Sequence, residues 1–253
     1  MGCRKNVKNL TAGEKSAFVA AVLGVYAKPS VLHPGDPTRN RYDDFVEIHM
    51  NAMMAQIGNP EVPNFTPGWA HYGPAFFPWH RILVYEFERE LQSVNSTVTV
   101  PYWDWADPAS NPFTPDFLGG AGTGANAQVL PADGPFAHDG PNHWVLHVVD
   151  NVGDPDYLQR YLNGADPGQA GFPVTLPALA DVTNDLAMTP YEVNPWKGFP
   201  TIDNCFRSHH EADLHNWIHN WVGGTHALPS AVASRPARQR WTRRLRCTPR
   251  TGQ

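Results

Sequence analysis

The chain lacks the features of several common protein classes. No apolar run approaches the length that crosses a membrane. The first residues, MGCRK, are followed by no apolar stretch and contain no twin arginine, so we expect no signal peptide of the chain's own. The cysteines Cys3, Cys205 and Cys247 are too few and too scattered for a disulfide framework or a thiolate metal site. These absences argue against a membrane protein and against a small disulfide-stabilised domain.

Acidic residues are missing from the end of the chain. No Asp or Glu follows Asp213, whereas residues 235–250 contain seven arginines. Such a charge break is typical of a tail that behaves separately, so we expect a domain over residues 1–228 and a basic tail over residues 229–253 outside the fold. A nucleic-acid-binding arm is the alternative interpretation. It is disfavoured because a stacking surface needs several aromatic residues and the tail has only Trp241.

Helical signals occur in four segments of the chain. Residues 11–14 read TAGE, which fits a capping box with Thr11 as the N-cap of a first helix. Further helices are expected over residues 42–53, from Pro78 to about residue 91, and around residues 214–219 with an end at the glycines 223 and 224. Because 25 prolines and 21 glycines interrupt the chain, residues 98–200 are expected to be mostly loop. The sequence therefore predicts a mainly α protein, an antiparallel four-helix bundle with long irregular loops.

Histidines with metal-ligand spacing occur near the end of this bundle. His215 and His219 are four residues apart, so on a helix both rings project from one face. The spacing alone is equally typical of a pair of structural histidines. A zinc protease of the HExxH type is excluded, because it needs a glutamate after the first histidine and this chain has Asn216.

A second group of histidines carries a more specific pattern. Residues 71–81 read HYGPAFFPWHR, so that His71 lies in a loop rich in Gly and Pro and His80 opens a helix. The helical His49 could join them at one metal, because neutral imidazole suits copper, zinc, iron and nickel.

These segments together resemble the bacterial-type tyrosinases. Residues 71–81 and the following helix resemble the copper A region of that family, and residues 100–105, VPYWDW, resemble the segment after it. Residues 214–224, LHNWIHNWVGG, are similar to the start of the family's copper B region. The resemblance implies a centre of two copper ions that binds O2 and oxidises phenols to o-diphenols and o-quinones. It implies that copper A is held by His49, His71 and His80, and that His215 and His219 supply two ligands of copper B.

The resemblance also implies two residues that act on the substrate's proton. The family places an Asn after the first copper B histidine, matched here by Asn216, and a Glu shortly before it. Together they orient a water that deprotonates incoming monophenols. Glu211 is the candidate for that Glu, although it precedes His215 by four residues, which is closer than the family's usual spacing. An ordinary carboxylate near a helix N-terminus is the alternative interpretation of Glu211.

The sequence departs from the family after the two glycines. The family continues with D-P-x-F-x-x-H-H, which contains the third copper B ligand, whereas this chain reads THALPSAVASR from residue 225 and enters the basic tail. Both changes fall at one place, as a change of reading frame would produce. His226 is the only histidine beyond His219. We therefore expect an incomplete copper B site and an atypical or truncated C-terminus.

Two functions follow from these observations. The first is a tyrosinase-like copper oxidase, of the tyrosinase, catechol oxidase or o-aminophenol oxidase class, that takes a phenol and O2, with activity impaired by the missing ligand. The second is a metal-binding or oxygen-binding protein without turnover. Bacterial relatives of this type also imply a helper protein that delivers copper and carries the export signal, and we expect neither a nucleic acid nor a membrane as partner.

Overall fold

The chain is mainly helical. The computed structural model describes residues 3–54, 70–148, 154–164, 175–193 and 204–223. Its longer helices are α1 (Ala12–Tyr26), α2 (Arg41–Met54), α3 (Phe76–Val94), α4 (Leu179–Leu186) and α6 (Asn216–Gly223), and shorter turns are η1 (Val7–Asn9), η2 (Ala125–Ala127), η3 (Leu162–Gly164), α5 (Phe206–His209) and η4 (His210–His215). Within the described ranges, extended segments meet only as isolated bridges and form no strand. No described helix is long and apolar enough to cross a membrane. The prediction of a mainly α protein with long loops is confirmed.

Helix α1 begins where the sequence predicted. The Oγ1 atom of Thr11 accepts the Glu14 amide at 3.2 Å, and the Glu14 carboxylate accepts the Thr11 amide at 2.9 Å. This reciprocal capping satisfies two amides that the first helical turn would otherwise leave unpaired. Phe18, Val22 and Val25 then form one buried face. This face packs in the main core with Leu91 of α3 and with loop residues that include Phe117, Phe136 and Trp144.

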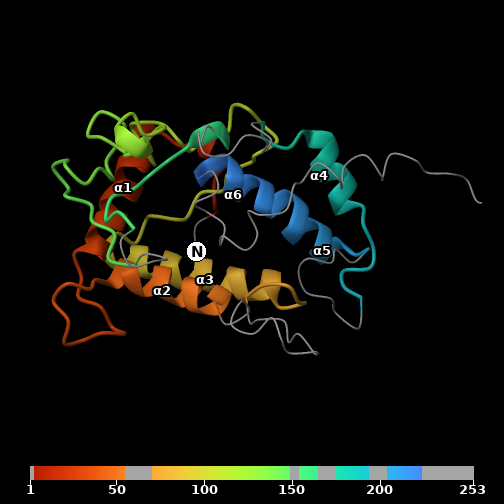
Figure 1. Cartoon of the computed structure of the whole chain (residues 1–253), viewed down its shortest axis with the longest axis horizontal. Helices are drawn as coiled ribbons and strands as arrows, with labels where there is room; N and C mark the ends of the chain where they lie inside the picture. The colour runs from red at the N-terminus through yellow and green to blue at the C-terminus, as the bar shows by residue number, and fades with distance from the viewer. Residues whose placement is uncertain (1–2, 55–69, 149–153, 165–174, 194–203, 224–253) are drawn as a thin grey trace, which may run out of the picture.

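Helices α2 and α3 lie side by side and run antiparallel (Figure 1). Three successive contacts join the two helices. Arg41 pairs with Glu90 at 3.1 Å. The ring centres of Phe45 and Phe87 are 5.3 Å apart, and those of His49 and His80 are 5.4 Å apart. As the residue number rises along α2, that of its partner on α3 falls. The sequence placed the start of α3 near Pro78, but the helix begins at Phe76. Pro78 is accepted in this first turn because its missing amide proton has no partner there.

A third helical run lies over this pair. Residues 206–223 are helical throughout, first as α5, then as η4, which has the wider π form, and then as α6. The sequence indicated only its last part, around residues 214–219. The π turn interrupts the regular α-helical spacing of apolar residues that would have indicated the earlier part of the run. Such turns are frequent at functional sites. Helix α4 was also not expected, because residues 98–200 were predicted to be mostly loop.

The long loops are fixed by buried polar contacts. Arg160 is 8% exposed and donates from Nη1 to the carbonyl oxygens of Leu118 and Gly119 at 2.5 and 2.6 Å. Its guanidinium also lies 5.0 Å from the ring centre of Phe113, which in turn packs against Trp221 of α6 at 5.7 Å. The loop region thus supports the end of the third helical run.

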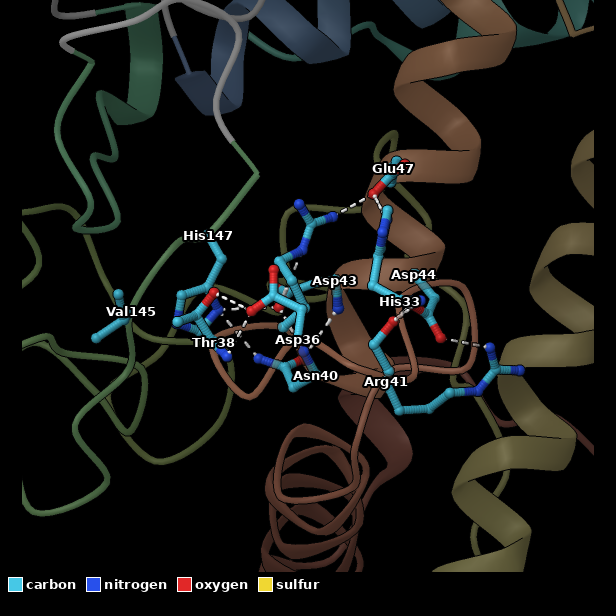
Figure 2. A network of polar contacts seen from close by, with 12 residues as sticks. His33, Asp36, Thr38, Asn40, Arg41, Asp43, Asp44, Glu47, Val145 and His147 are labelled. Atoms are coloured by element: carbon cyan, nitrogen blue, oxygen red, sulfur yellow. Dashed lines mark hydrogen bonds and ion pairs between the residues drawn. The ribbon is translucent and has the colours of Figure 1, made fainter.

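The N-terminal end of α2 is held by a polar network, which Figure 2 shows. Asp44 is fully buried and accepts hydrogen bonds from the Ser30 hydroxyl at 2.5 Å, from the Val31 amide at 2.8 Å and from Arg41 at 2.9 Å. Asp43 accepts the Asn40 amide at 2.8 Å and pairs with His147 at 2.9 Å. Carboxylates in the first turn also interact favourably with the positive end of the helix dipole. The network fixes the direction of α2 and therefore the position of His49 two turns later.

Leu91 tests the core between α1 and α3. Its side chain is fully buried in that core, whereas Ile82 on the same helix is 62% exposed. We expect Leu91→Ala to lower the free energy of unfolding by about 2–5 kcal/mol, because it removes buried methyl groups and leaves a cavity. Urea denaturation measures this change. Ile82→Ala is the matched control and should change stability by less than about 0.5 kcal/mol; similar losses for both variants would contradict the assigned core.

Candidate metal centre

Three histidines from two helices and a loop form a compact group. His49 comes from α2, His80 from the first turns of α3, and His71 from the loop that leads into α3. The ring centres of His49 and His71 are 5.4 Å apart, and those of His71 and His80 are 4.9 Å apart. One ring nitrogen from each lies within 4.8 Å of the others. The group could therefore hold a metal ion.

Two further histidines form a pair on the third helical run. His215 ends η4 and His219 lies in α6, and their ring centres are 4.4 Å apart. Their Nε2 atoms share a hydrogen bond of 2.9 Å. Two imidazole nitrogens aimed at one point are the arrangement that a shared metal ion requires. The prediction that the four-residue spacing puts both rings on one face is confirmed.

The two groups meet at the first residue of α3. The ring of His215 lies 6.0 Å from that of His71 and 6.2 Å from that of His80. Phe76 packs between the groups, with its ring 4.7 Å from His80 and 5.1 Å from His215. The structure therefore brings together all five histidines that the sequence singled out. Phe76 was not singled out, and its only signal is its place in the motif over residues 71–81.

Several ring nitrogens in the group are free to bind a ligand. Nδ1 of His80 donates to the Phe76 carbonyl oxygen at 2.7 Å, which leaves a lone pair on Nε2. This Nε2 atom and Nδ1 of His71 are buried and have no hydrogen-bond partner among the described residues. Buried polar atoms without partners are costly and rare. The donor set thus fits a metal ion, which would satisfy both atoms.

Burial keeps these rings neutral. Loss of solvation is the main cause that lowers the pKa of His49 to about 4 and that of His71 to about 3, with neighbouring histidines adding to the shift. Burial likewise lowers the pKa values of His80, His215 and His219. Only the neutral ring can coordinate a metal. The five rings are therefore in the ligating form at neutral pH.

The two proposed proton-handling residues lie beside this centre. Glu211 is 1% exposed, and its carboxylate accepts the Tyr72 amide at 2.6 Å and Arg207 at 2.9 Å. Burial raises the pKa of Glu211 to about 7 despite the arginine. Asn216 lies next to His215, with its Oδ1 3.2 Å from Nδ1 of that ring, and donates to the Ala212 carbonyl oxygen at 3.3 Å.

Arg207 was missed as a functional candidate. Its side chain is 2% exposed and bridges Glu192 and Glu211. The sequence did not single it out. A buried role for an arginine cannot be read from residue type, because arginine is mostly exposed in proteins. His226 and the basic tail lie outside the described residues, so the expected gap in copper B stays a prediction.

Comparisons with known proteins show what the chain is similar to. Residues 39–236 match the family model described as the common central domain of tyrosinase, and all five histidines fall inside that range. The chain is 40% identical to a tyrosinase of Streptomyces glaucescens and 38% identical to one of Streptomyces antibioticus, each over 88% of this chain and 73% of the relative. It is 32% identical to a grixazone synthase of Streptomyces griseus, over 87% of this chain and 74% of that protein.

A solved structure has a fold similar to that of this chain. A polyphenol oxidase from Thermothelomyces thermophila, the mutant G292N, aligns with a TM-score of 0.53 and 26% sequence identity. The alignment covers 87% of this chain and 61% of that chain, so less than two thirds of the larger protein is represented.

The lowered histidine pKa values predict how the metal-free chain responds to acid. Unfolded histidines take up protons near pH 6.5, whereas folded His49 and His71 do so only near pH 4 and 3. The unfolded state therefore binds more protons in this window, and each such proton lowers stability by about 1.4 kcal/mol per pH unit. Glu211 acts in the opposite sense, because its raised pKa favours the folded state as pH falls through 7, but it is one group against five.

We expect the free energy of unfolding of the metal-free chain to fall between pH 6.5 and pH 5. Urea denaturation at closely spaced pH values measures the slope. A variant with His49→Gln and His71→Gln should show a shallower slope. A parent chain whose stability stays flat or rises over this interval would contradict the buried neutral state of the rings.

Proposed function

Because the chain belongs to the tyrosinase family, we propose that it is a copper-dependent oxidase that converts mono- and o-diphenols to o-quinones with O2. One observation carries the proposal. Five neutral histidines from separate parts of the chain converge, with ring nitrogens that face each other or lack any other partner. A purely structural cluster would pair the buried Nδ1 of His71 and Nε2 of His80, which have no hydrogen-bond partner among the described residues.

We assign the ligands of two copper ions from this arrangement. His49, His71 and His80 would hold one ion, and His215 and His219 would contribute two ligands to the other. When bound, the pair of ions would supply the activation of O2 and the two-electron oxidation of the phenol. Helices α1, α2 and α3 and the helical run over residues 206–223 would form the four-helix bundle around them. Contacts of α1 with both α2 and α3 support that grouping.

The chain's own residues would orient the ligands and limit access of water. The Phe76 carbonyl oxygen holds His80 in the tautomer that leaves Nε2 free to coordinate. The Phe76 ring packs against His71, His80 and His215, so an apolar group contacts three of the five imidazoles. A copper-delivering helper protein stays a prediction of the family resemblance.

Glu211 and Asn216 are the proposed proton-handling pair. A general base works best when its pKa lies near the operating pH, and the pKa of Glu211 is raised to about 7. A carboxylate has about four acceptor sites, so the two hydrogen bonds of Glu211 leave capacity for a water molecule. We propose that this water, held with the help of the Asn216 side chain, takes the phenolic proton of a monophenol.

A second function is favoured by the uneven ligand sets. Three histidines form the first group, whereas the described residues supply two to the second. A chain that fills only the first site would bind one metal ion without turnover. Copper content separates the two functions, since the oxidase needs two ions per chain.

Oxidation of L-DOPA by the copper-loaded chain tests the proposed function. We expect measurable but weak oxidation, with two copper ions at saturation, and none after His80→Ala. Restoring the segment D-P-x-F-x-x-H-H after residue 228 should raise the rate by at least roughly 10–100-fold, the usual effect of lost support at a metal ligand. Equal rates with and without the segment would show that copper B needs no ligand from that segment. His226→Ala would then show whether that histidine completes the site. One copper ion and no turnover would favour the second function.

Glu211→Gln tests the proton-handling role. Glutamine cannot accept a proton at this position, so monophenol oxidation should fall more than o-diphenol oxidation. We expect the ratio of the two rates to drop by roughly 100-fold, the lower range for loss of a general base. The ratio cancels any change in copper content. Asp213→Asn, on the same helical run and 35% exposed at its side chain, is the control and should leave the ratio unchanged. An unchanged ratio in Glu211→Gln would remove Glu211 from the reaction.

A further inference from the structure

A buried ion network links the two histidine groups through the main chain. Arg207 donates to Glu192 twice, at 2.5 and 3.0 Å, and once to Glu211 at 2.9 Å. The other oxygen of Glu211 accepts the amide of Tyr72 at 2.6 Å. Tyr72 directly follows His71, whereas Glu211 lies in η4, four residues before His215. The network therefore spans from the helical run that carries one group to the loop that carries the other.

Tyr72 needs such an anchor. Its φ angle is +60°, in the left-handed region that residues with bulky side chains rarely occupy. A backbone held in this region persists only when surrounding contacts fix it, and such residues cluster at functional sites. The short, charge-assisted hydrogen bond from its amide to Glu211 is a contact of that kind. The turn at Tyr72 in turn determines where the His71 ring lies.

The chemistry of Glu211 suits this task in a way that an amide would not. One oxygen accepts from a main-chain amide and the other from a guanidinium, so both neighbours are donors. A glutamine has only one acceptor oxygen and would turn its own donor towards one of them. The arginine is needed because a buried carboxylate without a cation would be strongly disfavoured.

Neighbouring contacts hold the same elements together. The Tyr191 hydroxyl donates to the Pro74 carbonyl oxygen at 2.8 Å, in the loop that follows His71. The rings of Phe77 and Phe206 are stacked 5.3 Å apart. The segment next to Glu192, the start of α3 and the start of α5 therefore form one unit around Arg207.

We infer that Arg207 and Glu211 are positioning residues for the metal centre: the carboxylate, held by the guanidinium, fixes the main chain at Tyr72 and thereby places His71 beside His80 and His215. The inference rests on the proposed function in that the positioned ring is a copper ligand. It is separate from the proton-handling role of Glu211, because it concerns the oxygen that binds the Tyr72 amide and needs no transfer of a proton.

Two double variants isolate the hydrogen bond to Tyr72. Both carry Arg207→Met, which removes the cation, and one adds Glu211→Gln while the other adds Glu211→Met. Both are uncharged and similar in size at position 211, but only the glutamine retains an oxygen that can accept the Tyr72 amide. Asp185→Asn is the control, because Asp185 is a buried carboxylate that pairs with His210 of the same helical run.

Two measurements are made on each variant, with circular dichroism to confirm equal helix content. Hydrogen exchange of the Tyr72 amide reports on the anchor without any metal, and a competition titration reports on copper affinity. We expect the methionine variant to exchange roughly two- to tenfold faster than the glutamine variant, the effect of one lost hydrogen bond between uncharged groups. Its copper affinity should be roughly 10–100-fold lower, as for other residues that orient metal ligands. Asp185→Asn should match the parent in both measurements.

The outcomes separate this inference from the proposed function. Equal exchange and equal copper affinity in the two double variants would overturn the positioning role, whether or not the parent oxidises phenols. A difference in exchange without a difference in affinity would also overturn it, because the anchor would then not act on the metal ligand. A parent chain that binds no copper would refute the proposed function and, with it, the assignment of His71 as a positioned ligand.

Discussion

The main physical constraint on this structure is that five imidazole rings are buried close to one another, away from water. Each ring loses solvation on folding, and the cost is visible in pKa values that fall to about 4 for His49 and about 3 for His71. Hydrogen bonds within the metal-free protein do not fully offset this loss of solvation, because two of the buried ring nitrogens have no hydrogen-bond partner among the described residues. The fold must therefore supply rigid support from outside the cluster, and a bound metal would supply the missing partners.

That support comes from two separate ion networks. In the first, Arg41 joins Asp44 of its own helix to Glu90 of α3, which fixes α2 against α3 and so sets His49 opposite His80. In the second, Arg207 joins Glu192 to Glu211, which binds the main-chain amide of Tyr72, the residue after His71. Buried pairs of this kind contribute little to stability, but they can specify one arrangement among several. Here each network orients a segment that carries a histidine.

The sequence predicted the parts that depend on local signals. Residue type and spacing alone predict three features: the capping box at Thr11, the pairing of His215 with His219, and the loop position of His71. Other features depend on contacts between distant segments and leave no local signal. The π turn over residues 210–215, the left-handed Tyr72 and the buried Arg207 are of this kind. Helix α4 was missed because its eight residues lie between proline-rich segments and show no long periodicity. The convergence of the five histidines was predicted from the ordered match to the family's motifs together with the four-residue spacing of His215 and His219.

The position of bound metal tests the central claim most directly. Crystals of the copper-loaded chain, measured at the absorption edge of copper, would show each ion as a peak of anomalous scattering. The account predicts one peak within roughly 2.0–2.1 Å of nitrogens from His49, His71 and His80, a usual metal–imidazole distance. It predicts a second, weaker peak between the Nε2 atoms of His215 and His219. A peak elsewhere, or no copper among these five rings, would contradict the account.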